Sequence, residues 1–282
     1  MLPANQLSNS FVVVTPNFNM GSYLAETIES VLRNIRPGDE YYIIDGGSSD
    51  ESVEIIKKYA HRLTGWVSEK DDSYADAISK GFMRGTGRYQ CWINSGDLLL
   101  NDSLDLARKL LDKSNADMIF GDDFYIDCNS NVLAYSRGAC RNLRLAMLYG
   151  AWTPLQDACF WRSDLYKRVG GLNKSLQNAA DYDLFARFAV DGNVCYMPYA
   201  FSAFRKHDGQ HSIAHTKSYQ REKNDIRCKL VAKSDESLLK KIFLRCYFFM
   251  AVRWRVYVMQ RIWDKSRLHF KPINQLKATR YW

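Results

Sequence analysis

The stretch YYIIDGGSSD, residues 41–50, holds an apolar run that ends in an aspartate, then two glycines and a polar start to the next segment. Aromatic and β-branched residues favour a strand, and Gly46 and Gly47 allow a sharp turn in which the backbone approaches a ligand closely. Ser48 and Glu51 have the spacing of a helix capping box. A strand, a glycine turn and a helix in this order are typical of α/β sheets, whose ligands bind beyond the carboxyl ends of the strands.

The same alternation of short apolar runs and helix-period patterns extends to both sides of this stretch. It predicts an α/β fold with a mostly parallel sheet flanked by helices, followed by a helical C-terminal extension. In the first half we expect strands at residues 11–15, 41–45, 65–67, 89–93 and 117–120, and helices at 23–34, 50–59, 74–83 and 104–111. In the second half we expect a hairpin at 127–132, helices at 163–169 and 180–190, an extended run at 194–204, and helical structure from residue 212 onwards.

The composition narrows the class of protein. A chain of 282 residues with 46% hydrophobic residues can bury a sizeable core. The seven cysteines are widely spaced and include no C-x-x-C pair, which argues against a zinc knuckle, a redox motif and a disulfide framework. The first ten residues have neither a basic start nor a long apolar run, so we expect no signal peptide and a cytoplasmic location.

The net charge of +8 is concentrated at the C-terminus, because residues 221–282 hold sixteen of the 39 Lys and Arg but only five of the 31 Asp and Glu. This shift predicts a catalytic domain at 8–207 and a basic, aromatic-rich extension at 208–282. Arginines interrupt the aromatic segment 242–263, so none of its uncharged runs is long enough to cross a bilayer. Two interpretations stay open for this segment, a helix packed on the domain or, as we favour, a peripheral anchor on the anionic inner face of a membrane. Nucleic-acid binding is not expected, because no recognition module is present.

Aspartates follow successive predicted strands. Asp45 closes the second strand, Asp71 and Asp76 follow the third, and Asp97 follows the fourth. The carboxyl ends of parallel strands lie at one edge of the sheet, so these carboxylates are expected to converge where they can hold a ribose, a base edge or a divalent cation. For any one of them alone, a helix cap or a turn residue is the competing interpretation.

Six segments, in this order, resemble those of family 2 glycosyltransferases, a large inverting family with the GT-A fold. They read TPNFN (15–19), IIDGGSSD (43–50), SEKDDSYADAISKGF (68–82), WINSGDLL (92–99), FWRSDLYKRVGGLN (160–173) and ADYDLFAR (180–187). The resemblance implies transfer of a sugar from a nucleotide-diphosphate sugar to a hydroxyl, with inversion and with Mg²⁺ or Mn²⁺. It further implies a glycan or lipid-linked glycan acceptor, in the synthesis of a bacterial capsule, O-antigen or exopolysaccharide.

The resemblance also implies which residues bind the donor. The loop after the first strand would cover the nucleotide, and the carboxylates after the second and third strands would lie near its base and ribose. The implied residues are Thr15, Pro16, Asn19, Asp45, Asp76 and Asn94, and Arg205 is a candidate for steadying the diphosphate.

The implied reaction needs a cation and a base. The nucleoside diphosphate leaves with negative charge that a divalent cation neutralises, and the attacking hydroxyl must lose a proton to a nearby carboxylate. The resemblance places Asp97 and His207 at the metal and Asp181 at the base, with a plain surface histidine as the alternative for His207. Asp183 lies two residues beyond Asp181 on the same predicted helix and so points away from it. We expect Asp183 to pair with Arg187 instead.

One departure from the family's pattern keeps a second class of protein open. Relatives usually carry two adjacent carboxylates where this chain has Gly96 and Asp97. The missing carboxylate favours weaker metal binding, so a catalytically silent nucleotide-sugar-binding protein that acts as a partner or scaffold is the alternative. A nucleotidyltransferase is disfavoured, because the loop after the first strand has no basic residue. Three further residues lie where relatives bind the acceptor and fit either a stacking surface or the core: Trp152, Gln156 and Trp161.

Overall fold

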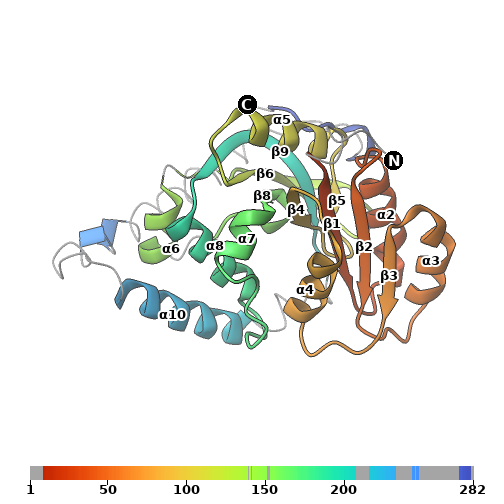
Figure 1. The fold of residues 1–282 in the computed structure, drawn as a ribbon, viewed down its shortest axis with the longest axis horizontal. Coiled ribbons are helices and arrows are strands. Elements are labelled where there is room, and N and C mark those ends of the chain that lie inside the picture. Colours follow the sequence, from red (N-terminus) through yellow and green to blue (C-terminus); the bar gives the residue numbers. More distant parts are fainter. Residues whose placement is uncertain are drawn as a thin grey trace.

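The computed structural model describes residues 9–138, 140, 142–150, 153–207, 216–232, 243–244, 246–247 and 273–280. Over these residues the chain forms one nine-stranded sheet with helices on both faces (Figure 1). The strand order is β3-β2-β1-β4-β8-β6-β9-β5, and β7 pairs with β6 outside this order. The sheet is mostly parallel, as predicted from the alternating pattern.

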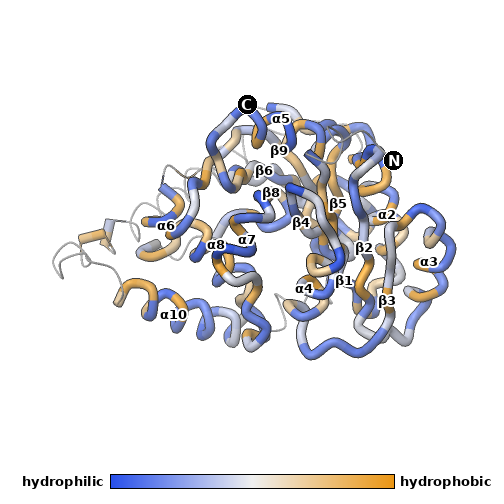
Figure 2. The backbone as a smooth tube through the Cα atoms, viewed as in Figure 1, coloured by the Kyte–Doolittle hydropathy of each residue, from blue (hydrophilic) through white to orange (hydrophobic). Residues whose placement is uncertain are grey.

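The first half of the chain builds the parallel part of the sheet. Its strands are β1 (Phe11–Asn17), β2 (Glu40–Asp45), β3 (Gly65–Ser68) and β4 (Tyr89–Trp92). The helices between them are α2 (Gly21–Leu32), α3 (Ser52–Tyr59) and α4 (Tyr74–Arg84). Since β1 pairs in parallel with both β2 and β4, the carboxyl ends of these strands meet at one edge. Figure 2 shows that the segment leading from β3 into α4 along this edge is hydrophilic.

The second half mixes parallel and antiparallel strands. It contains β5 (Leu98–Leu99), α5 (Ser103–Lys113), β6 (Met118–Ile126), β7 (Val132–Ser136) and α6 (Leu143–Gly150). It continues with β8 (Cys159–Arg162), α7 (Ser163–Arg168), α8 (Ala180–Asp191), β9 (Val194–Arg205) and α10 (Thr216–Ala232). Strand β8 lies antiparallel between β4 and β6 and thereby joins the two halves into one sheet.

Alternate side chains of the central strands enter two separate cores. Val12 and Val14 of β1 pack on one face with Trp92, Trp161 and the apolar sides of α4 and α8. Phe11 and Val13 face the other way and pack against α2, α3 and α5. Period-two alternation in a strand covered on both faces gives this division. Trp161 is fully buried, so it is a core residue and not part of a surface that stacks on the acceptor.

Three elements were missing from the sequence prediction. The strands β5 and β8 are only two and four residues long. Helix α6 has a local signal that the sequence interpretation did not use, because the Asn142 side chain accepts the Leu145 N–H at 3.0 Å and caps the helix start. The strand expected at 117–120 is also longer, because β6 runs on to Ile126 and pairs with both β7 and β9. The predicted hairpin is confirmed as the β6–β7 turn.

The expectation of helix from residue 212 to the end is confirmed for α10 and wrong near the C-terminus. After a short 3-10 helix, Ile273–Gln275, the chain makes single bridges with the main sheet region, Lys277 to Asn101 and Thr279 to Ala200. Most of the segment 242–263 lies outside the described residues, so both interpretations of it stay predictions. None of the helices in the described part of the chain has the length and apolar character needed to span a bilayer.

Candidate active site

Asp45 ties together the loops at the carboxyl edge of the sheet. Its Oδ1 accepts hydrogen bonds from Asn17 Nδ2 at 2.6 Å and Ser48 Oγ at 2.5 Å, and its Oδ2 accepts from Ser68 Oγ at 2.6 Å and the Ser48 N–H at 3.0 Å. Burial raises the pKa of Asp45, but these donors outweigh it and hold the pKa below its usual range. The Ser48 hydroxyl therefore donates to Asp45 and does not cap α3, so the capping box expected with Glu51 does not form.

The loop after β1 presents a mixed set of groups. Thr15 is buried and its hydroxyl lies 3.0 Å from the Tyr41 hydroxyl, so its side chain faces the core and not the edge. The carbonyl of Pro16 accepts the Ser95 hydroxyl at 3.2 Å, which joins this loop to the segment before β5. Asn19 is exposed, has a φ of 51°, and accepts the Ser49 N–H at 2.8 Å. Phe18 is 62% exposed, an aromatic ring at this edge that the sequence interpretation had not singled out.

Asp76 lies in a charged cluster instead of standing alone at the edge. Lys80 contacts Asp71 at 2.6 Å, Glu69 at 2.9 Å and Asp76 at 3.2 Å, and Lys174 contacts Asp76 at 2.9 Å. The hydrogen bond from Lys174, joined by that from Lys80, lowers the pKa of Asp76. Neither lysine was identified from the sequence. Lys80 had a local signal, because it lies four residues after Asp76 on α4, whereas nothing local links Lys174 to Asp76.

Asp97 is held rigidly at the end of the segment that follows β4. Its Oδ1 accepts the Arg205 N–H at 3.0 Å, its Oδ2 lies 3.4 Å from Asn94 Nδ2, and its carbonyl accepts the Thr27 hydroxyl at 2.9 Å. Gly96 has a φ of +108°, a conformation that residues with a side chain rarely adopt. The backbone conformation at this position therefore favours glycine.

Two further buried carboxylates lie near Asp97. Asp123 of β6 and Asp157 of the 3-10 helix Gln156–Ala158 are almost fully buried, and within the described part of the chain one oxygen of each has no hydrogen-bond partner. Burial and then the charge of Asp157 raise the pKa of both Asp97 and Asp123. The sequence carried one weak signal for them, the charged pair 122–123 inside an apolar strand.

A divalent cation in this region would take only part of its ligands from the protein. Among the described residues, no three His, Cys, Asp or Glu side chains are arranged to hold a metal ion. Mg²⁺ in phosphate-transfer sites is typically held by one or two carboxylates and completed by substrate phosphates and water. Asp97 is the candidate for such a ligand, and Asp157 lies close enough for its charge to raise the pKa of Asp97.

Arg205 is fully engaged inside the protein. Its guanidinium donates to the carbonyl of Gly96 at 2.8 Å, the carbonyl of Asp127 at 2.9 Å, Ser130 Oγ at 3.0 Å and Glu26 at 2.5 Å. The residue is 1% exposed. Contact of this guanidinium with a diphosphate would require these bonds to break, so its geometry favours a role in holding the Asp97 segment.

His207 lies two residues beyond the end of β9 and is partly exposed. The His207 ring centroid is 5.4 Å from that of Tyr23. The Arg205 guanidinium lies over the same Tyr23 ring, 4.8 Å from its centroid. The structure therefore keeps His207 near the Arg205–Asp97 segment, and its role as a metal ligand stays a prediction.

Asp181 lies in the first turn of α8 and is partly exposed. Its Oδ1 accepts the Tyr182 N–H at 2.7 Å, and its own N–H donates to the Tyr74 hydroxyl at 3.2 Å. Burial raises the pKa of Asp181 to about 6, partly opposed by the charge of Lys223. Burial, and then the charges of Asp157 and Asp181, raise the pKa of the buried Cys159 thiol. A carboxylate of this kind is ionised near neutral pH and still basic enough to take a proton.

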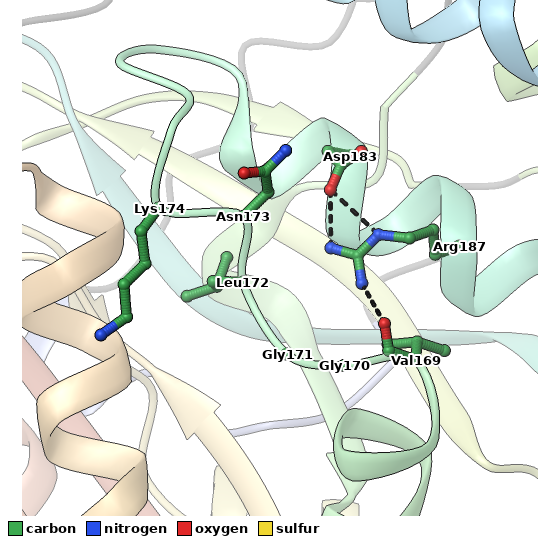
Figure 3. Close-up of a pocket in the computed structure, with 8 residues that line it drawn as sticks. All are labelled: Val169, Gly170, Gly171, Leu172, Asn173, Lys174, Asp183 and Arg187. Atoms are coloured by element: carbon green, nitrogen blue, oxygen red, sulfur yellow. Dashed lines mark hydrogen bonds and ion pairs between the residues drawn. The ribbon is translucent and has the colours of Figure 1, made fainter.

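The expected pairing of Asp183 is confirmed. Arg187 donates to Asp183 Oδ2 at 2.6 Å and to the carbonyl of Val169 at 2.7 Å. Figure 3 shows this pair at the wall of an open pocket of about 430 Å³ that is otherwise lined by residues 169–174. Lys174 points out of this pocket, and its ammonium contacts Asp76. The pocket thus lies on the Asp183 side of α8.

Of the two remaining candidates for acceptor contacts, Gln156 and Trp152, the structure describes only Gln156. Gln156 donates to the carbonyl of Trp92 at 2.8 Å and accepts from Asn94 at 2.9 Å, so it braces the segment that leads to Asp97. Trp152 lies outside the described residues.

A largely parallel sheet with carboxylates and glycine turns at its carboxyl edge is typical of α/β proteins that bind a ligand at this edge. Residues 12–170 match the sequence model described as "Glycosyl transferase family 2". This chain belongs to that family, and the resemblance first drawn from six short segments is confirmed.

Known proteins similar to this chain agree with the assignment. An uncharacterized glycosyltransferase of Rickettsia typhi is 24% identical over 213 residues, which are 73% of this chain and 67% of the relative. Chondroitin synthase of Escherichia coli is 23% identical over 203 residues, 65% of this chain but only 28% of the relative. The chain therefore spans at most about two thirds of these relatives.

Two solved structures show the same fold. S. aureus TarS (residues 1–349, with UDP-GlcNAc) superposes with a TM-score of 0.65 at 16% identity, covering 85% of this chain and 71% of TarS. The mannosyltransferase PcManGT of Pyrobaculum calidifontis, with GDP-Man and Mn²⁺, gives a TM-score of 0.62 at 14% identity, covering 89% and 73%. The GT-A fold is confirmed.

Proposed function

We propose that this protein is an inverting glycosyltransferase that transfers a sugar from a nucleotide-diphosphate sugar to a hydroxyl of a glycan or lipid-linked glycan. The observation that carries the proposal is Asp181, a partly exposed carboxylate whose pKa is raised to about 6 by burial. A general base works best when its pKa lies near the operating pH, and near pH 7 this group is ionised and able to accept the proton of a hydroxyl.

The donor is expected to bind at the carboxyl edge of β1, β2 and β4. Asp45 ties the ends of β1 and β3 to the loop after β2, and the exposed Phe18 and Asn19 and the partly exposed Pro16 are the proposed contacts of the nucleotide. The complexes of TarS with UDP-GlcNAc and of PcManGT with GDP-Man support a nucleotide sugar as donor, without indicating which one this chain uses.

Asp97 is the proposed ligand of a divalent cation, with His207 as a further candidate. When bound, Mg²⁺ or Mn²⁺ would supply charge neutralisation of the diphosphate as a Lewis acid. The protein's own contribution is to hold Asp97 still, because the Arg205 N–H donates to its carboxylate and the Thr27 hydroxyl donates to its backbone carbonyl. The Mn²⁺ in the PcManGT complex supports a cation in this role.

The chemical step follows from these positions. Asp181 accepts the proton of the acceptor hydroxyl as its oxygen attacks the anomeric carbon, while the nucleoside diphosphate departs from the opposite side. One base and one displacement invert the configuration at that carbon. The protonated Asp181 then releases its proton to water, which is favourable at neutral pH because its pKa is about 6.

Polysaccharide synthesis is the proposed setting, supported by the similarity to chondroitin synthase. Cytoplasmic location and peripheral contact with the inner face of the membrane are part of the same proposal, supported by the basic residues of 221–282.

A panel of UDP- and GDP-sugars, screened first by thermal shift with Mn²⁺ and then by release of nucleoside diphosphate, tests the proposal. A ligand of the folded state raises the apparent melting temperature. An enzyme releases nucleoside diphosphate from one donor in a metal-dependent way. A silent binding protein, the alternative prompted by Gly96, would show the shift without turnover with any acceptor.

A further inference from the structure

Helix α10 comes after the segment that the family model covers, yet it packs against the helix that carries Asp181. It contacts both α6 and α8, and Ile226 on its inner side is buried in the same core as Trp92 and Phe185. Figure 1 shows α10 lying alongside α8, on the side of the molecule away from α3. Two consecutive residues of α10, Glu222 and Lys223, face the start of α8.

Glu222 binds the backbone directly before α8. Its carboxylate accepts the N–H groups of Gln177 at 3.2 Å, Asn178 at 2.9 Å and Ala179 at 2.8 Å. Burial raises the pKa of Glu222, but these N–H donors outweigh it and lower the pKa. Free N–H groups and the positive end of the helix dipole make a helix start favourable for a negative charge. Glu222 therefore caps from outside the helix whose first turn holds Asp181.

Lys223 is a buried cation beside the proposed base. It is 6% exposed, its Nζ donates to Thr153 Oγ1 at 2.9 Å, and it lies over the Tyr182 ring at 4.8 Å. Among the described residues, no carboxylate lies within ion-pair distance of this ammonium. Burial lowers the pKa of Lys223 to about 8, and Asp181 is the carboxylate whose charge opposes that change.

We propose that α10 is part of the active site, with Glu222 and Lys223 as positioning residues: Glu222 fixes the start of α8, and Lys223 supplies the buried positive charge that favours ionised Asp181. This inference rests on the proposed role of Asp181 as the base. It assigns a function to the first helix of the C-terminal extension, which the charge shift alone had marked as separate.

The groups that face Asp181 come from three other elements. They are Tyr74 of α4, Cys159 of β8, and Tyr219, Lys223 and the negatively charged Glu222 of α10, with Arg227 acting on Lys223 from further along the same helix. Burial raises the pKa of the tyrosines and of the thiol well above neutrality, so these groups stay uncharged through the working range. Lys223 is thus the one described group of this set that places a positive charge beside Asp181.

The sign of the expected effect follows directly. A nearby positive charge stabilises the carboxylate, so removal of the Lys223 charge raises the pKa of Asp181. A general base is active when ionised, and its rate falls as the pH drops through its pKa. The acid limb of the activity profile should therefore move to higher pH when Lys223 loses its charge.

The test compares Lys223→Met with Lys223→Arg and with Lys229→Met, a matched control at an exposed position of α10. With the nucleotide sugar that supports turnover, the acid limb of kcat/KM should shift upward by roughly one pH unit in Lys223→Met. It should return towards the wild-type position in Lys223→Arg and stay in place in Lys229→Met. A folded Lys223→Met protein with an unchanged acid limb would overturn the role of Lys223.

A second measurement does not depend on activity. Carbon NMR titration of the Asp181 carboxyl in the full chain, with Asp181→Asn to assign its signal, should show the same upward shift in Lys223→Met. For Glu222→Gln, kcat should fall while the donor dissociation constant stays unchanged, and an unchanged kcat would overturn its role. If the wild-type protein turns over no donor, the proposed function fails, whereas turnover with an unshifted carboxyl signal rejects the role of Lys223 alone.

Discussion

The substitution Asp181→Asn tests the assignment of the base with little change in shape. The amide oxygen can still accept the Tyr182 N–H that Asp181 Oδ1 accepts at 2.7 Å, so the first turn of α8 should keep its structure. With a pKa of about 6, Asp181 is about 90% ionised at pH 7, so nearly every wild-type molecule carries the active base. Loss of a positioned general base costs roughly 10²–10⁴-fold in rate. We expect kcat to fall by that factor while the donor dissociation constant, measured by calorimetry, stays within about twofold.

The matched control is Asp183→Asn, two residues further along α8. It breaks the ion pair with Arg187, which is partly exposed, and should cost about 0.5 kcal/mol of stability without a comparable loss of rate. In the wild-type protein, kcat/KM should fall about tenfold per pH unit below pH 6, and this acid limb should be absent from the residual activity of Asp181→Asn. A loss of less than about tenfold in Asp181→Asn, or a larger loss in Asp183→Asn, would refute the assignment.

Three further predictions concern the metal position, the glycine beside it and the C-terminus. Asp97→Ala should stay folded and lose the Mn²⁺ enhancement of donor binding in calorimetry, and an unchanged enhancement would contradict the proposed ligand. Gly96→Ala should lower the free energy of unfolding by about 1–2 kcal/mol in urea titration, because the φ of +108° strains a residue with a side chain; an unchanged midpoint would contradict this. A chain shortened after Ala232 should melt at a lower temperature, since it loses the buried Ile273 and Leu276, each worth roughly 1.5–3 kcal/mol; it should also no longer sediment with anionic liposomes. Retained sedimentation would exclude the membrane anchor, and an unchanged melting temperature would contradict the packing.

The parallel half of the fold was predictable because its signals are local. Strands β1, β2 and β4 are four to seven residues long, consist mainly of apolar and aromatic residues, and end at a polar or glycine-containing turn. Strand β8 was not predictable, because its four residues gain their structure by pairing antiparallel with both β4 and β6. The bridge between Lys277 and Asn101 is equally non-local, and periodicity along the chain carries no information about it.

The site divides in the same way. The places of Asp45 and Asp97 follow from their positions after strands, and the opposite directions of Asp181 and Asp183 follow from helix geometry. The direction of a long side chain does not follow from its position in the sequence. Arg205 was expected near the diphosphate, but its guanidinium bonds Glu26 inside the protein.

Contacts between distant segments were equally hidden. Asp157, Glu222 and Lys223 reach the site from segments with no motif of their own, and only the folded chain brings them to Asp97 and Asp181.

The most direct test of the central claim is proton NMR of the transfer reaction, run with the donor found in the screen and a soluble acceptor analogue, with and without Mn²⁺. An inverting glycosyltransferase gives metal-stimulated release of nucleoside diphosphate in equal amount to a glycoside whose anomeric configuration is opposite to that of the donor. A product with the donor's configuration would contradict the single displacement assigned to Asp181, and donor binding without any product would show that this chain is a silent member of its family.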